Sequence, residues 1–183
     1  MRSNSLGNGT AGMSVKDILR ENKADLVKKW FEAVLETYHE ESRAPMRRRE
    51  AQFANPVGFN LAQGLEGLFD GLLQGMMPAD VATHLDAMVR IRAVQDFAPS
   101  RAVSFIFQLK RIIREVLPPE RLGDPASAGE IREMDDAIDD LALYAFDLYM
   151  RCRETVYDIK AKEAQSATFR LLQQAKILTE RKE

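Results

Sequence analysis

The stretch Phe53–Gly75, FANPVGFNLAQGLEGLFDGLLQG, decides the fold because it combines a helix start, an apolar stripe and a row of glycines. Asn55 can cap the free amides of a helix, and Pro56 suits the first helical position, where a missing N–H costs nothing. Apolar residues then recur at steps of three and four, namely Leu61, Leu65, Leu68, Phe69, Leu72 and Leu73. This spacing predicts an amphipathic helix whose apolar face is buried.

A row of glycines runs beside that apolar stripe, at Gly64, Gly67, Gly71 and Gly75. Each glycine inside a helix costs about 0.8–1 kcal/mol relative to alanine, so some contact must offset the loss. Glycine admits the close approach of either another helix or a ligand. We favour helix packing, because it is the commoner of the two.

Outward from this stretch, the same spacing predicts five further helices. They span Ser14–Asn22, Lys23–His39, Met77–Gln95, Ser100–Val116 and Glu130–Lys182. The predicted core consists of Trp30, Leu65, Leu68, Phe69, Phe105, Leu109, Leu141 and Leu148. We therefore expect one all-α bundle of about six helices with a long C-terminal helix, in which the short first helix lies over the core as a lid.

Two segments are predicted to connect helices without structure of their own. Glu40–Gln52 contains Pro45 and the basic run Arg47–Arg49, and we expect a mobile connection there. The three arginines could bind phosphate, but consecutive charges on a helix point in different directions, so a solvated surface is favoured. Pro118–Gly129 carries two helix breaks and is predicted to be the second connection.

The predicted C-terminal helix is longer than the core of a domain of this size requires. Its first part carries an apolar stripe that can pack on the domain, ending near Cys152. Its last part carries a stripe of smaller residues in a displaced register, at Ala164, Ala167, Leu171, Ala175 and Leu178. We expect these five residues to form a weak homodimer contact or to bind a partner protein; otherwise the tail frays.

Composition excludes several classes of protein. The 183 residues, 45% of them hydrophobic, suffice for one domain with a real core. The 26 basic and 28 acidic residues nearly cancel, so no global field attracts nucleic acid or an anionic membrane. Cys152 is the only cysteine, which excludes a disulfide framework and indicates a reducing, cytoplasmic setting. We expect no membrane insertion, and a disordered leader over residues 1–13.

Catalytic and metal-binding motifs are missing from the sequence. The two histidines, His39 and His84, stand apart and form no HExxH pair. The carboxylate pairs Asp135–Asp136 and Asp139–Asp140 diverge by about 100° on a helix, which is typical of a solvated face. No glycine-rich phosphate loop follows a strand, and no GxSxG elbow occurs. We therefore predict a protein that is not an enzyme and that holds no metal or cofactor.

Two blocks of the chain resemble a known family. FANPVGFNLAQGLEGLFDGLL and VRIRAVQDFAPSRAVSFIFQLKRIIREVL are similar to the two signature blocks of the RsbRD N-terminal domain family of bacterial signalling proteins, over roughly Asp25–Arg151. The resemblance implies a non-catalytic sensory module. In related stressosome co-antagonists this domain resembles a globin without haem, acts in sensing and dimerisation, and precedes a STAS domain. This chain is expected to lack that output domain.

From the resemblance we expect a globin-like sensory domain over residues 14–160 and a helical extension over 161–183. Its function would be signalling or regulation through protein–protein contacts. The alternative is a small adaptor or regulatory subunit of a larger enzyme complex. A third and less favoured alternative is a haem-binding globin-like sensor, for which His84 would be the ligand, although the resemblance points to a haem-free version.

Overall fold

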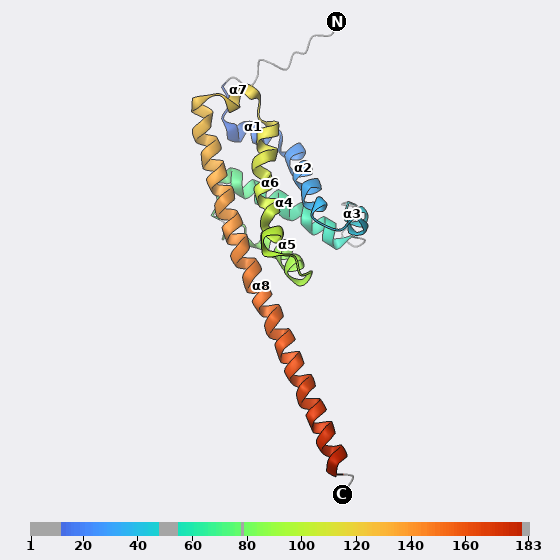
Figure 1. The fold of residues 1–183 in the computed structure, drawn as a ribbon. Helices are drawn as coiled ribbons and strands as arrows, with labels where there is room; N and C mark the ends of the chain where they lie inside the picture. The colour runs from blue at the N-terminus through green and yellow to red at the C-terminus, as the bar shows by residue number, and fades with distance from the viewer. Residues whose placement is uncertain (1–11, 48–54, 78, 181–183) are drawn as a thin grey trace.

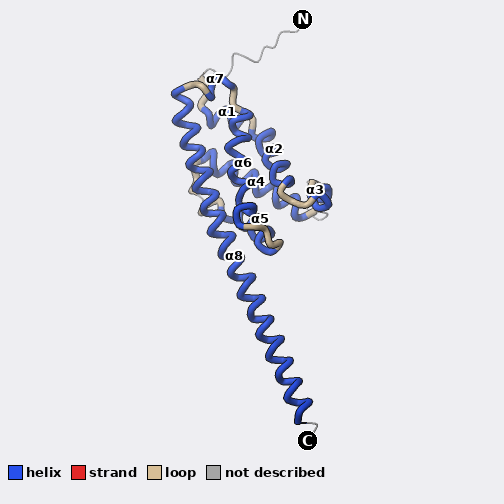
Figure 2. The backbone as a smooth tube through the Cα atoms, viewed as in Figure 1, coloured by secondary structure: helices blue, strands red, loops and turns tan. Residues whose placement is uncertain are grey.

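The structure is a computed structural model that describes residues 12–47, 55–77 and 79–180 (Figure 1). The described residues form eight helices and no strand, which confirms the all-α prediction with its long C-terminal helix (Figure 2). The helices are α1 (Val15–Glu21), α2 (Lys23–Glu36), α3 (Glu40–Met46), α4 (Pro56–Gln74), α5 (Ala82–Val94), α6 (Pro99–Val116), α7 (Pro119–Leu122) and α8 (Pro125–Glu180). The short helices α3 and α7 are additional to the six predicted ones.

Helix α8 runs along the whole body and then continues beyond it (Figure 1). Helices α5 and α6 pack against its first half, while α4 packs on α5 and α2, and α2 packs on α6. Val156 is half-buried, and beyond it the Lys160 side chain still reaches the Asp96 carboxylate at 3.9 Å. At 1.5 Å per residue, the projecting span 157–180 is about 36 Å long.

The predicted core is confirmed except at one position. Seven of its eight residues are at most 1% exposed, namely Trp30, Leu65, Leu68, Phe69, Phe105, Leu109 and Leu141. Leu148 is the wrong prediction, because it is only half-buried. Two successive steps of four from Leu141 reach Ala145 and Tyr149, and Tyr149 takes the inward position instead.

Helix α1 belongs to the core rather than covering it as a lid. Val15, Ile18 and Leu19 are all buried. Its start is capped, since the Ser14 hydroxyl accepts a hydrogen bond from the Asp17 amide at 3.1 Å. Three buried side chains in a helix of seven residues explain why so short an element is held in place.

The central helix α4 begins and packs as its sequence predicts. The Asn55 side chain accepts a hydrogen bond from the Gly58 amide at 3.0 Å, and Gly75 ends the helix in the left-handed conformation with φ 68°. The glycine stripe faces α5. A Cβ on Gly64 would lie 3.0 Å from the His84 carbonyl oxygen, and a Cβ on Gly71 would lie 2.3 Å from Val81 Cγ1. Helix packing is therefore confirmed as the reason for these two glycines.

The segment Glu40–Gln52 is not an unstructured connection over its described part, because residues Glu40–Met46 form α3. Met46 is buried and anchors the end of this helix on the body. Pro45 lies inside this short helix, where its missing N–H cannot donate to the Glu41 carbonyl oxygen. Of the basic run, Arg47 pairs with Glu32 at 3.1 Å, and Arg48 and Arg49 lie outside the described residues. The predicted disordered leader, residues 1–13, also lies almost entirely outside the described residues.

Helix α8 begins five residues earlier than predicted, at Pro125. The Asp124 carboxylate accepts hydrogen bonds from the amides of Ala126 and Ser127, both at 3.2 Å, which is a normal helix start. Gly129 is carried inside the helix. Conversely, α5 begins later than predicted, at Ala82, and residues 79–81 before it form a turn.

Candidate functional site

The loop between α5 and α6 is the most unusual piece of backbone that the structure describes. This loop, Gln95–Ala98, contains Asp96, whose φ of 57° is the one positive value at a described residue other than glycine. Aspartate tolerates the left-handed region better than most residues, but the conformation persists only where surrounding contacts hold it. The contacts that hold this loop come mainly from α8.

Side chains of α8 bind the loop at the level where α8 leaves the body. The Tyr149 hydroxyl donates to the Phe97 carbonyl oxygen, and the Arg153 guanidinium donates to the Asp96 carboxylate. Arg153 also donates to the Ala93 carbonyl oxygen at 2.9 Å. We call these three α8 contacts with the α5–α6 loop region the junction. They fix the start of the projecting tail to a strained turn.

The electrostatics of the junction favour its charged form. The hydrogen bond from Arg153, helped by the Lys160 charge 3.9 Å away, holds the pKa of Asp96 below its ordinary value of 3.8. Burial raises the pKa of Tyr149, so its hydroxyl stays a donor. Arg153 further donates to the Tyr157 hydroxyl and lies over that ring, with its Cζ 4.6 Å from the centroid.

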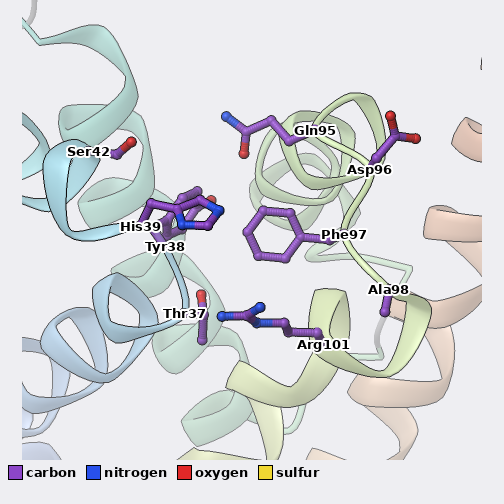
Figure 3. Close-up of a pocket in the computed structure, with 9 residues that line it drawn as sticks. All are labelled: Thr37, Tyr38, His39, Ser42, Gln95, Asp96, Phe97, Ala98 and Arg101. Carbon is purple, nitrogen blue, oxygen red and sulfur yellow. The ribbon is translucent and has the colours of Figure 1, made fainter.

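A cleft of about 420 Å³ opens on the other side of the same loop. It is lined by Thr37–His39 and Ser42 from the α2–α3 region, and by Gln95–Ala98 and Arg101 from the α5–α6 region (Figure 3). We call it the loop cleft. In Figure 3 the Phe97 ring projects from the α5–α6 loop toward His39 and Tyr38, and the Arg101 guanidinium points toward Thr37. The loop cleft and the junction thus share two residues of the loop, Asp96 and Phe97.

A buried arginine lies beneath the loop cleft. The side chain of Arg92 is fully buried, with its Cζ 5.1 Å, 5.3 Å and 4.7 Å from the ring centroids of Tyr38, Phe97 and Phe105. It donates to Thr37 Oγ1 at 2.9 Å and to a carbonyl oxygen of α6 at 3.1 Å, while its Nε has no partner. No carboxylate of the described chain pairs with it. Burial accordingly lowers the pKa of Arg92.

The surface of α8 carries an apolar stripe that begins inside the body. Leu143, Phe146, Met150 and Tyr157 are 66%, 40%, 37% and 57% exposed. Their spacing of three, four and seven residues is that of a heptad seam, and it continues through Ala164, Ala167, Leu171 and Leu178. We call these eight residues the outer stripe. Four of the five predicted contact residues therefore belong to a stripe that is longer than the sequence prediction recognised.

The described part of the tail places these predicted contact residues away from the body. Ala164 and Leu171 are exposed, and Ala167 is half-buried. Ala175 and Leu178 lie in the last part of α8, whose side chains are outside the description. The heptad register passes through Gln174, so Ala175 stands at the edge of the outer stripe.

His84, the candidate haem ligand, lies on the surface. Its side chain is exposed, and its ring covers Gly67 so closely that a Cβ there would lie 2.6 Å from Nε2. A haem ligand must instead project from its helix into a large apolar cavity. The close packing of α4 on α5 at this point does not fit a haem.

Basic residues of α6 form surface ion pairs with the acidic residues of α8 that the sequence analysis singled out. Arg114 binds Asp135 through two hydrogen bonds, and Lys110 Nζ lies 2.7 Å from Asp139. These pairs join α6 to α8, so the residues expected to be merely solvated meet across two helices. Among the described residues, no group of three histidine, cysteine or acidic side chains could hold a metal ion.

Sequence reasoning missed the residues of the junction and the arginine beneath the loop cleft. A signal for Arg92 was present, because it follows Leu85, Met88 and Val89 on the inward face of α5. A charged residue at an apolar position indicates a buried, functional or structural cation. Arg153 and Asp96 carried no comparable signal, since their contact joins residues 57 apart in the chain.

Comparison with known families supplies the decisive observation. The family model described as the RsbT co-antagonist protein rsbRD N-terminal domain matches residues 24–163, about three quarters of the chain. The chain belongs to this family. The match covers every helix of the body from α2 onward and continues past the junction into the tail. Neither a curated protein nor a solved structure gives a significant match.

Membership in the rsbRD N-terminal domain family indicates a bacterial signalling module, and the family is not known for catalysis. Within the described ranges, every helix is too short or too polar to cross a bilayer. The globin-like arrangement stays a prediction.

Proposed function

We propose that this rsbRD N-terminal domain is a non-catalytic sensory module whose helical body controls the pairing of α8 with a second copy. The observation that carries the proposal is the outer stripe, because it runs without interruption of register from the body into the projecting tail. The projecting part of α8 is about 36 Å long and has no core of its own to stabilise it. A second copy provides the missing apolar surface.

The composition of the outer stripe favours weak pairing, which we propose to be parallel. Parallel pairing sets Leu143 against its counterpart and joins the two bodies at the same end. Two heptad positions on the stripe are basic, Arg153 and Lys160. Arg153 forms an ion pair with Asp96 of the body and so points away from the seam. Lys160, which lies 3.9 Å from Asp96, places a charged residue in the seam. Such residues lower the stability of a coiled coil while they specify its register.

The junction explains how the body could control the tail. Tyr149 and Arg153 are bound to the loop Gln95–Ala98, and the next residues of α8 are already exposed. A displacement of this loop therefore turns or shifts α8 at the level of the outer stripe. Small helix shifts of this kind are a common way to pass a signal between packed domains. We assign residues 14–160 to the sensory body and 161–183 to the output extension, in a cytoplasmic protein.

The proposal is tested by light scattering on the full chain. We expect a dimer at high micromolar concentration, and Leu171→Glu should convert it to a monomer because it buries a charge in the seam. Phe169→Glu is the matched control, since Phe169 and Leu171 are similarly exposed but lie on opposite sides of α8. Equal effects of both substitutions, or of neither, would contradict pairing through the outer stripe.

A second candidate function is that of an adaptor whose tail binds a larger protein. Phe169 and Leu172 favour it, because both are exposed and lie off the outer stripe, where a two-helix pair would leave them in water. A monomeric full chain at every concentration in the light-scattering experiment would support this alternative over the dimer.

A further inference from the structure

We propose that the loop cleft binds a small amphipathic carboxylate, whose anionic group is held by Arg101 and by the amino end of α6. Three independent features of the described structure meet in this cleft. They are an excess of positive charge, an uncapped helix start and a wall of aromatic rings.

The positive charge is not neutralised by the protein's own described carboxylates. Arg92 is fully buried under the rings of Tyr38 and Phe97, which line the cleft, and its Nε is unpartnered. Arg101 on the rim forms no ion pair with a described residue. Asp96 is the carboxylate on the rim, and it is already bound by Arg153. An incoming anion therefore meets the Arg101 guanidinium at the rim, above the buried positive charge of Arg92.

The start of α6 adds further donors at the same spot. Its N-cap residue is Ala98, which has no side chain that could accept from the first amides, and Pro99 has no amide to offer. The amides of Ser100 and Arg101 thus lack a side-chain cap, at the positive end of an 18-residue helix. Ala98 and Arg101 both line the loop cleft.

The aromatic wall defines the rest of the ligand. The rings of Tyr38 and Phe97 meet edge to face, with centroids 5.4 Å apart, and Arg101 Cζ lies 5.8 Å from the Phe97 centroid. A volume of about 420 Å³ lies within the usual range for small-molecule sites. An aryl or short alkyl carboxylate can contact both the positive charge and the aromatic rings of the cleft, whereas inorganic phosphate would leave the rings uncovered.

Binding at this place would act on the backbone that α8 holds. The Phe97 ring lines the loop cleft, and the Phe97 carbonyl oxygen accepts from Tyr149 at the junction. An effect of the ligand on α8 rests on the function proposed above. Binding itself does not, so the two claims can fail separately.

The test is a ¹H–¹⁵N NMR titration of the full chain with benzoate, phenylacetate and hexanoate. Neutral phenylacetamide and inorganic phosphate serve as comparison ligands. We expect dissociation constants of about a millimolar for these small probes, with shifts concentrated in residues 37–42 and 95–101. Phenylacetamide and phosphate should bind at least about tenfold more weakly. No shift with any carboxylate, or equal shifts with phenylacetamide, would overturn the proposal.

Variants then test whether the Arg101 side chain binds the carboxylate. Arg101→Gln should weaken carboxylate binding by about tenfold or more, since one charge-assisted pair is lost. Arg111→Gln is the matched control, because Arg111 is an exposed arginine of the same helix that pairs with Glu115 away from the cleft. Equal affinity of the two variants would overturn the role of Arg101. Light scattering on the same samples separates the claims: a monomer that binds carboxylate contradicts only the pairing of α8, and a dimer that binds none contradicts only the ligand.

Discussion

Asp96 is the residue at which the body and the terminal helix are joined. Its left-handed backbone conformation aims its carboxylate at α8, where Arg153 binds it. An aspartate whose folded pKa is depressed contributes stability that is present above its unfolded pKa and is lost as the pH falls through the folded value. The junction is therefore intact at neutral pH and opens in acid.

We predict that the Asp96 carboxyl ¹³C signal titrates with a midpoint below 3.8, and that Arg153→Gln moves this midpoint upward toward 3.8. Asp124 is an internal control in the same spectra. Its pKa is also lowered, but by hydrogen bonds from Ser127 and Ala126, so it should not respond to the substitution. An Asp96 midpoint that ignores Arg153→Gln would show that the ion pair is absent in solution.

The burial of single residues was predictable from sequence where it depends only on which face of a helix they occupy. Trp30 and Phe105 follow the apolar period and are buried, and the Trp30 Nε1 donates to the Phe105 carbonyl oxygen at 2.7 Å. Leu148 was wrong because its neighbour Tyr149 is amphipathic: its ring is buried while its hydroxyl reaches a loop carbonyl oxygen. Periodicity alone does not tell which of two adjacent large side chains turns inward.

At the scale of elements, the contact between α4 and α5 shows what each glycine does. Gly71 is buried against Val81, whose β-branched side chain is stiff, so an added methyl group meets an atom that cannot withdraw. Gly67 faces only the exposed His84 ring, which can swing aside. In α8, Gly129 has open space around it.

We therefore predict opposite effects of the same substitution, measured by urea unfolding followed by circular dichroism. Gly71→Ala should lower the free energy of unfolding by roughly 1 kcal/mol or more, because overpacking exceeds the gain in helix propensity. Gly67→Ala should be neutral or stabilising by up to about 1 kcal/mol, and the control Gly129→Ala should stabilise by about 0.8–1 kcal/mol. A Gly71→Ala chain as stable as the Gly129→Ala chain would show that α4 and α5 are not in close contact.

Element boundaries were predictable where a cap and an apolar stripe coincide. Asn55 and Pro56 stand directly before the apolar stripe of α4, and α4 begins there. Asp124 and Pro125 are the same type of signal, but Gly129 follows before the stripe of α8 and suggested a break. Packing of α8 on α5 and α6 overrides the weak helix propensity of one exposed glycine.

For the whole molecule, the fold class followed from periodicity, and the family match agrees with the resemblance of the two sequence blocks. The outer stripe did not follow, because the inward face of α8 has to be known before the outward residues Leu143 and Phe146 can be recognised as exposed. The loop cleft did not follow either. It brings Thr37 and Arg101 together across three intervening helices.

The most direct test of the central claim, that α8 pairs in parallel with a second copy, is an electron-spin distance measurement. Gln173 is exposed and off the outer stripe, so a nitroxide is attached to Gln173→Cys in a Cys152→Ser background. Parallel pairing predicts a single distance below about 30 Å, set by a helix spacing of about 10 Å and the label arms. An antiparallel pair centred on the outer stripe would offset the labels by about 25 residues, roughly 38 Å along the axis. That longer distance, or no dipolar coupling at all, would contradict the account.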